Sequence, residues 1–271
     1  MRLKFQHIVA HMTAIVMMAA CSGDVDMTDV GKGSFTLGLS TDGMNVEVVT
    51  RAAHELTASE AAEYDVTLSQ EDEIVWSKPY ADIISADCTQ PLGKGYAVSA
   101  ENCTITEAET ANDGWGRTRF AGVSDRFVIA SGQTTPVMVV CSMQNAGLCV
   151  MFDESFTDYF SEYAVTTDDL RALKFHAENA AEFDANRQLT HGTIAYYNVE
   201  DDGTHTIDLI ISASAGWDGT VRLTRSLTLQ RGRITRLRVH LGNAPLGSIS
   251  SISITYSDIF DESEEEILLK D

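Results

Sequence analysis

The side chains that could do chemistry are scattered along this 271-residue chain and form no known catalytic pattern. The sequence holds no GxSxG nucleophile elbow, no phosphate-binding loop, no HExxH pair and no CxxC pair. The acidic segments DESFTD (153–158) and EDD (200–202) lack the DxDxDG spacing of a calcium loop. The histidines beyond residue 20 are far apart: His54, His176, His191, His205 and His240. The sequence therefore predicts no enzyme, no metal site and no cofactor.

Cys21 is the residue whose setting predicts a covalent modification. Arg2 and Lys4 precede an apolar segment of about a dozen residues, which is too short to span a bilayer but fits a secretory signal peptide. Ala19 and Ala20 directly before Cys21 resemble the lipobox of bacterial lipoproteins, although Met18 stands where leucine is usual. We therefore expect residues 1–20 to be a signal peptide and Cys21 to carry fatty acyl chains such as palmitate. The alternative is an ordinary signal peptide followed by a coincidental cysteine.

The segment after Cys21 is acidic, with Asp24, Asp26 and Asp29 close together. Such a segment resembles the export signal of surface lipoproteins in the Bacteroidetes. Residues 21–32 are thus expected to form an acidic tether, and the protein to be anchored in the outer membrane and exposed on the cell surface. A solvated tether without an export role is the alternative.

The charge of the chain limits its partners. Removal of residues 1–20 takes away two basic residues and no acidic one, so the formal charge changes from −21 to −23. A surface this acidic repels nucleic acid and anionic lipid head groups, so neither is an expected partner. The lipid at Cys21 remains as the membrane attachment, and two or three acyl chains would suffice for it.

Four further cysteines leave the disulfide pattern open. Cys141 and Cys149 lie in apolar alternating stretches, which favours buried free thiols. A bridge between Cys88 and Cys103 stays open as an alternative.

The chain repeats itself at an interval of about one hundred residues. Three pairs of segments match in order: 64–68 with 163–167, 112–122 (around Trp115) with 214–224 (around Trp217), and 127–152 with 227–252. A period this long is typical of a whole domain rather than of a solenoid repeat. The sequence therefore predicts two tandem units, 33–140 and 141–271, joined by a short rigid connection.

Within each unit the apolar residues recur every second position, which is the period of a strand with one buried face. Turn pairs such as Asp113–Gly114 and Asp202–Gly203 separate the strands. Short alternating strands favour β-sandwiches, so we predict an all-β fold of two tandem sandwich domains. Helical turns are expected only as loop decoration at 53–63, 153–162 and 178–187. The acidic end, 261–271, is expected to be solvated, with an edge strand in EILLK as the alternative.

Several segments resemble a known group of proteins. The lipobox, GSFTLGLS, the TRA at 50–52, LGKGYAVSAEN and VMVVCSMQNAGLCVMF are similar to those of two-domain, fimbrillin-like lipoproteins of gut and oral Bacteroidetes. The resemblance implies transthyretin-like (Greek-key) sandwiches and assembly by strand exchange, in which a protease trims an N-terminal strand after an arginine. Arg51, which follows candidate strands at 34–40 and 44–50, is the matching trimming site. An exposed loop arginine is the alternative.

The two repeat-related tryptophans allow two interpretations. An exposed Trp115 or Trp217 could stack on a sugar ring or a partner protein, whereas their matched positions favour packing under a loop. The expected function is an anchor or accessory component of a surface filament or adhesion apparatus, with pilus subunits or other surface proteins as partners. A glycan-binding lipoprotein of a polysaccharide-uptake system is the alternative.

Overall fold

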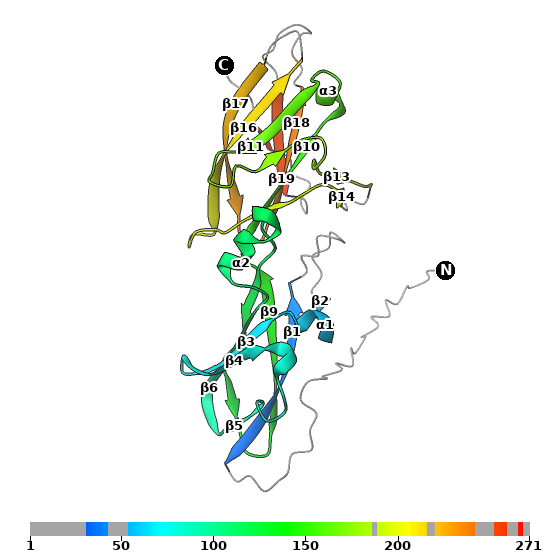
Figure 1. The fold of residues 1–271 in the computed structure, drawn as a ribbon. Coiled ribbons are helices and arrows are strands. Elements are labelled where there is room, and N and C mark those ends of the chain that lie inside the picture. Colours follow the sequence, from blue (N-terminus) through cyan, green and yellow to red (C-terminus); the bar gives the residue numbers. More distant parts are fainter. Residues whose placement is uncertain are drawn as a thin grey trace, which may run out of the picture.

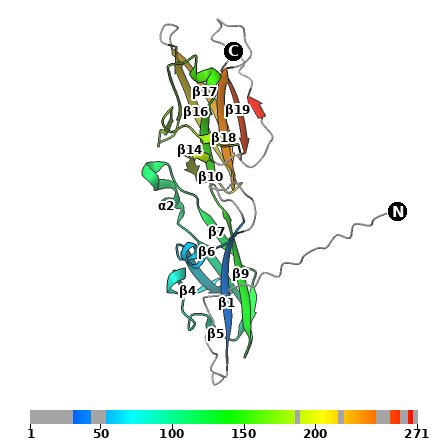
Figure 2. The same cartoon turned by 90° about the vertical axis from the view of Figure 1, so that its right-hand side faces the viewer.

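The computed structural model shows two β-sandwiches stacked along one long axis (Figures 1 and 2). It describes residues 31–42, 54–185, 189–215, 220–241, 252–258 and 265–267. The prediction of an all-β chain with two tandem sandwiches is confirmed. Among the described residues, no helix is long and apolar enough to cross a membrane.

The first sandwich contains nine strands, with the path β2-β1-β9-β7-β6-β3-β4 and with β5 on β1 and β8 on β6. Their alternating apolar residues point into a core that includes Phe35, Val66 and Tyr96. The strands are β1 (Lys32–Thr41), β2 (His54–Glu55), β3 (Asp65–Gln70), β4 (Glu73–Pro79), β5 (Thr89–Pro91), β6 (Gly93–Glu101), β7 (Phe120–Val123), β8 (Phe127–Ile129) and β9 (Thr134–Met143).

The second sandwich faces a five-stranded sheet, β15-β10-β18-β19-β20, against a four-stranded sheet, β12-β11-β16-β17. A separate hairpin pairs β13 with β14. The strands are β10 (Ala146–Phe152), β11 (Glu162–Thr167), β12 (Lys174–Phe175), β13 (Glu182–Phe183), β14 (Leu189–His191), β15 (Ala195–Tyr197), β16 (Thr204–Ser214), β17 (Thr220–Gln230), β18 (Ile234–Leu241), β19 (Ile252–Asp258) and β20 (Glu265–Ile267).

The two sandwiches have the same strand connections. In each, the first strand pairs in parallel with the last long strand, β1 with β9 and β10 with β18. In each, the next long strand lies between an edge strand and a long central strand, β3 between β4 and β6, and β11 between β12 and β16. The sequence repeat is therefore a repeat of topology, in which β3, β4, β6 and β9 correspond to β11, β12, β16 and β18.

Each sandwich has its own core. The first core ends in sequence at Cys141 and the second begins at Ala146. Two residues, Gln144 and Asn145, separate β9 from β10. The domain boundary predicted between residues 140 and 141 stays a prediction, because the bounds of β9 and β10 do not by themselves define where one domain ends.

Short helices occur at three places: α1 (Ala58–Ala61), α2 (Ile105–Thr110) and α3 (Glu154–Thr157). The predicted helical turns in 53–63 and 153–162 are present, whereas the described part of 178–187 contains the strand β13 and no helix, so that prediction is wrong over residues 178–185. The 3-10 turns η1 (Tyr80–Asp82) and η2 (Asn112–Gly114) complete the described elements. Thr57 and Thr104 cap α1 and α2 with the same reciprocal capping box.

The cysteines and the C-terminal segment give two further outcomes. Cys103, Cys141 and Cys149 are buried free thiols, so the interpretation of Cys141 and Cys149 is confirmed and the Cys88–Cys103 bridge is not formed. Near the C-terminus, β20 pairs with β19. Over the residues of β20, the expectation of a solvated end is therefore wrong and the alternative of an edge strand is supported. The candidate strand at 44–50 lies outside the described residues.

Candidate functional site

The residues singled out from the sequence fall largely outside the described part. Cys21, Arg51 and Trp217 lie in segments that the structure does not describe. Trp115 is described and lies between the two sandwiches, next to η2.

Trp115 contributes to the junction of the two sandwiches. Its ring meets Phe175 of the second sandwich edge to face, with 5.0 Å between the ring centroids, and it packs against the second core. Its carbonyl accepts a 2.7 Å hydrogen bond from the backbone N–H of Tyr196. A loop of the first sandwich thus inserts an aromatic side chain against the core of the second.

Arg171, which belongs to the second sandwich, also contacts both sandwiches at this junction. Its Nη1 donates to the carbonyls of Gly114 (3.1 Å) and Tyr196 (2.8 Å). Its guanidinium lies 3.9 Å from the centroid of the Tyr197 ring, and its Nε is 3.5 Å from Oδ2 of Asp169. Because one side chain satisfies carbonyls from both sandwiches, it fixes their relative position.

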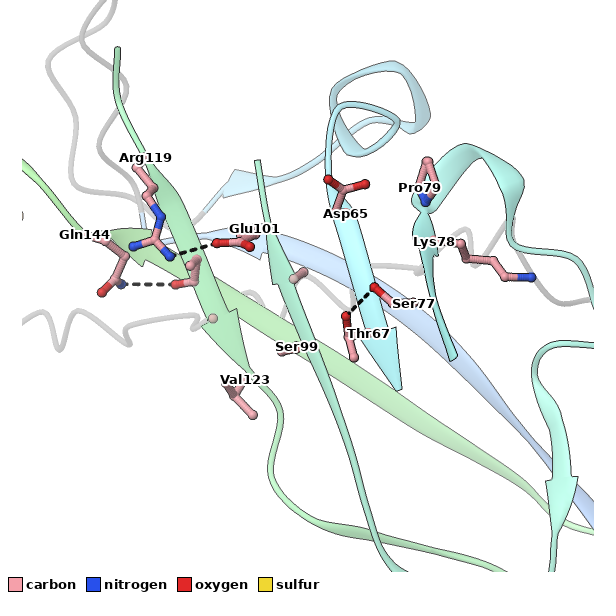
Figure 3. Close-up of a pocket in the computed structure, with 13 residues that line it drawn as sticks. Asp65, Thr67, Ser77, Lys78, Pro79, Ser99, Glu101, Arg119, Val123 and Gln144 are labelled. Carbon is pink, nitrogen blue, oxygen red and sulfur yellow. Dashed lines mark hydrogen bonds and ion pairs between the residues drawn. The ribbon is translucent and has the colours of Figure 1, made fainter. Parts of the chain in front are cut away.

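A polar groove of about 700 Å³ lies on the outer face of the first sandwich, over β4, β3, β6 and β7 (Figure 3). The strand register puts Ser77, Thr67 and Ser99 in one row across the sheet. The next row contains Asp65 and Glu101, which are direct partners on neighbouring strands. These positions point outward because their neighbours Val66, Val98 and Ala100 point into the core.

The groove has unequal sides. Arg119 and Gln144 lie on one side and Ser77 to Pro79 on the other, with the carboxylates between them (Figure 3). Small side chains on the floor make the surface concave. The amino-acid sequence alone does not reveal this groove, since hydroxyl residues at alternate positions look like any solvated strand face, and only the folded sheet shows the register that aligns them.

The charges in the groove are only partly paired. Arg119 donates from Nη2 to Oε2 of Glu101 at 2.7 Å and from Nε to the carbonyl of Cys103 at 3.2 Å. Asp65 makes no side-chain hydrogen bond or ion pair in the part of the chain that the structure describes. Two like charges opposite each other on adjacent strands destabilise a sheet. The ion pair of Glu101 with Arg119 offsets part of this cost, so Asp65 is the carboxylate of the two that lacks a charged partner among the described residues.

The first strand forms a second candidate site. β1 pairs in parallel with β9 over eight register positions, from Ser34–Thr134 to Thr41–Cys141, and antiparallel with β5. Its side chains Phe35, Leu37 and Leu39 are at most 4 % exposed. β9 also pairs with β7 at its last residues, so it joins both sheets of the sandwich. β1 thus occupies a slot with core on one side and paired backbone at both edges.

The remaining titratable groups do not form a reactive centre. Burial raises the pKa of Cys141 and of Cys149 to about 12, and it also raises the pKa of Cys103, so all three thiols are neutral at physiological pH. The described residues contain no group of three or more side chains that could hold a metal ion. His191 lies against the carbonyl of Glu178, whereas His205 stacks on Tyr197.

The chain is similar in overall arrangement to two solved structures. One is a fimbrial assembly protein from Parabacteroides distasonis, at 12 % identity and a TM-score of 0.46, with 87 % of this chain and 100 % of that chain covered. The other is the fimbrial anchor protein Mfa2 from Porphyromonas gingivalis, at 10 % identity and 0.38, with 82 % and 98 % covered. Likeness at this level carries no functional argument.

Comparison with curated proteins gives no match. A family model, by contrast, covers residues 31–270, which is nearly the whole chain. Its description is "Domain of unknown function (DUF4493)". The resemblance found in the sequence pointed to such a family, and this chain belongs to the DUF4493 family.

Proposed function

We propose that this protein is a lipid-anchored component of the bacterial cell surface that acts by binding or assembly, as an anchor or accessory component of a filament or adhesion apparatus. The observation that supports the proposal best is the position of β1. It is the first described strand, it fills a slot in the first sandwich, and the chain continues from it to β2 through residues 42–53.

The second sandwich supplies the contrast. Its equivalent strand, β10, also pairs in parallel with the last long strand. However, β10 follows β9 after two residues and leads directly into α3, so both of its ends are held by folded elements. If β1 leaves its slot, the strands that lose their pairing with it are β9 and the short strands β2 and β5. Exchange is therefore expected at the first sandwich and not at the second.

Removal of β1 would have a defined physical cost. It would expose the core next to Phe35, Leu37 and Leu39 and leave the facing backbone groups of β9 without partners. A strand from another protein with the same alternation would restore both the apolar contacts and the hydrogen bonds. The slot thus suits a partner that offers an alternating β-strand, such as another surface subunit.

The anchoring part of the proposal depends on Cys21. Acylation there, followed by the acidic tether 21–32, would hold the first sandwich close to the membrane and leave the second projecting outward. In cells that export the protein, Cys21→Ser is expected to shift it from the membrane fraction to the soluble fraction.

Strand exchange can be tested on the folded chain. An arginine-specific protease is expected to cut after Arg51, and a fluorescent peptide of sequence KGSFTLGLSTD (residues 32–42) should then enter the slot and raise the fluorescence anisotropy. A peptide with serine in place of Phe35, Leu37 and Leu39 should not bind. The Arg51→Lys variant stays whole and should exclude both peptides.

Two results would count against this model. If Arg51 stays uncut while other loops are cut, trimming is excluded and β1 is a permanent strand. If the chain is cut but takes up no peptide, assembly through this slot is excluded.

A further inference from the structure

The second sandwich has its own polar groove, of about 510 Å³, on the outer face of the β12-β11-β16-β17 sheet. Its floor contains the small side chains of Ala164, Ser212 and Ser214. The register puts Ala164 opposite Ser212 and Glu162 opposite Ser214, so these residues face outward together. Lys174, His176 and Glu178 line the groove from β12 and the loop that follows it.

The two grooves occupy the same place in the repeated topology. The first lies over the start of β3, the end of β4, the end of β6 and the last three residues of β7. The second lies over the start of β11, Lys174 of β12 and the loop after β12, the end of β16 and the start of β17. Since β3, β4 and β6 correspond to β11, β12 and β16, a concave polar surface recurs at the same strand ends in both domains.

The grooves also share their chemistry. Each has a carboxylate at the first residue of the corresponding strand, Asp65 on β3 and Glu162 on β11, although the repeat aligns Asp65 with Ala164, two positions further along β11. Neither carboxylate makes a side-chain hydrogen bond or ion pair within the described ranges. Each groove has hydroxyl groups on the neighbouring central strand, such as Ser99 on β6 and Ser212 on β16.

The charges of the two grooves are balanced in the same way. The first combines Asp65 and Glu101 with Arg119, which is two negative charges and one positive, or −1. Lys78 does not count toward it, because it points away from the other labelled side chains and its Nζ lies 2.7 Å from Oδ1 of Asp87 (Figure 3).

The second groove combines Glu162 and Glu178 with Lys174, which is again −1. A strongly cationic ligand would be repelled by the basic side chain of each groove, Arg119 or Lys174. An anionic ligand would be repelled by the two carboxylates. A neutral ligand whose groups both donate and accept hydrogen bonds fits both grooves best, and sugar hydroxyls have this property.

We propose that these two grooves are repeat-related binding sites for a neutral glycan chain. The free carboxylates accept hydrogen bonds from sugar hydroxyls, while Arg119 and Lys174 donate to sugar oxygens. Small side chains on each floor leave room for a flat sugar ring. Two sites on one rigid chain favour a polymeric glycan, because binding at one site raises the effective concentration at the other. This proposal does not depend on strand exchange at β1.

The test is a titration of the ¹⁵N-labelled protein, without its first 20 residues, with neutral hexasaccharides of glucose, xylose and mannose, followed by amide chemical shifts. A binding hexasaccharide should shift amides around Asp65, Ser99 and Glu101 and, separately, around Glu162 and Ser212. Asp65→Asn should weaken binding about ten-fold at the first groove alone, as expected for loss of a hydrogen bond to a charged group. Glu162→Gln should do the same at the second groove alone.

The matched control is Glu73→Gln, which removes an exposed carboxylate of β4 that lines neither groove, and it should bind like the unmodified chain. The proposal is overturned if no hexasaccharide shifts these amides at about 10 mM, or if Asp65→Asn and Glu162→Gln both bind as tightly as the control. Shifts in the grooves with an unstructured mixed-charge peptide, but with no sugar, would instead assign them to a protein partner. All three variants keep β1 in place, so failure here leaves the assembly proposal standing.

Discussion

At the scale of single residues, the junction stacks three charged or aromatic side chains in a half-buried place. The His205 and Tyr197 rings lie 5.1 Å apart at an interplanar angle of 25°, and the Arg171 guanidinium lies over the Tyr197 ring. Burial raises the pKa of Tyr197 to about 12. Burial also lowers the pKa of His205, and the positive charge of Arg171 adds to this effect. Asp169, Glu200 and Glu109 oppose it without cancelling it.

The lowered pKa of His205 predicts a dependence of stability on pH. The folded chain holds this imidazole neutral, whereas in the unfolded chain it gains a proton below its usual pKa of about 6.5. The free energy of unfolding should therefore fall as the pH drops below about 6.5, down to the lower pKa of the folded state. Urea titrations between pH 7.5 and 5.5 should show a smaller fall for His205→Gln than for the unmodified chain.

His240→Gln is the control for this experiment, and it should keep the pH dependence of the unmodified chain. Carboxylates with a lowered pKa, such as Glu60 and Asp202, act only at lower pH, near or below 4. If His205→Gln and the unmodified chain lose stability in parallel from pH 7.5 to 5.5, His205 is not the group that titrates.

At the scale of elements, β17 is a long edge strand whose core-facing row contains a charge. Leu223, Leu227 and Leu229 of this row pack in or against the second core. Arg225 stands in the same row, opposite the buried Leu209 of β16, and donates from Nη1 to the carbonyl of Thr224. An inward-pointing charge on an edge strand discourages pairing with another molecule, because pairing would bury it.

Arg225→Val is therefore expected to make the chain associate. The change completes an apolar row along an 11-residue strand that pairs on one side only with β16 among the described elements. Sedimentation velocity at tens of micromolar should show dimers or larger species that the unmodified chain lacks. Arg222→Val, which removes the same charge from the outer face of the same strand, should stay mostly monomeric. Equal association of the two variants would mean that lost charge, and not the filled row, is the cause.

The sequence predicted the elements whose signal is local and missed those that depend on register. Alternation in 34–40 and 205–212 was sufficient for β1 and β16, because the side chains of each strand divide between core and solvent. The helix α2 was missed, although Thr104 and Glu107 form a capping box that a search for S/T-x-x-E would have found. The polar grooves could not be predicted, since they require knowing that Asp65 faces Glu101 and that Glu162 faces Ser214.

At the scale of the whole molecule, the two sandwiches are joined by buried contacts, apolar ones as well as polar ones, rather than by a linker. Asn145, at 1 % exposure, lies directly between β9 and β10. Its Oδ1 accepts from the backbone N–H of Arg119 (3.1 Å), and its Nδ2 donates to the carbonyl of Arg117 (2.7 Å). Its own carbonyl accepts from the N–H of Gly232, which belongs to the turn before β18. One residue thus connects loops from both sandwiches.

These contacts predict that the two sandwiches unfold together. Differential scanning calorimetry of the unmodified chain should show one transition. Asn145→Ala leaves a backbone N–H and a backbone carbonyl of the first sandwich without partners in a buried place, at a cost of about 2–4 kcal/mol. The variant should therefore show two resolved transitions, one for each sandwich.

The matched control for this prediction is Asn179→Ala. Asn179 makes the same two kinds of bond, from the N–H of His176 and to the carbonyl of Lys174, but wholly within the second sandwich. Its loss should lower the melting temperature without dividing the transition, because neither of these bonds involves the connection between β9 and β10. Two transitions already present in the unmodified chain would mean that the sandwiches fold independently, and the junction would then set their orientation without coupling their stability.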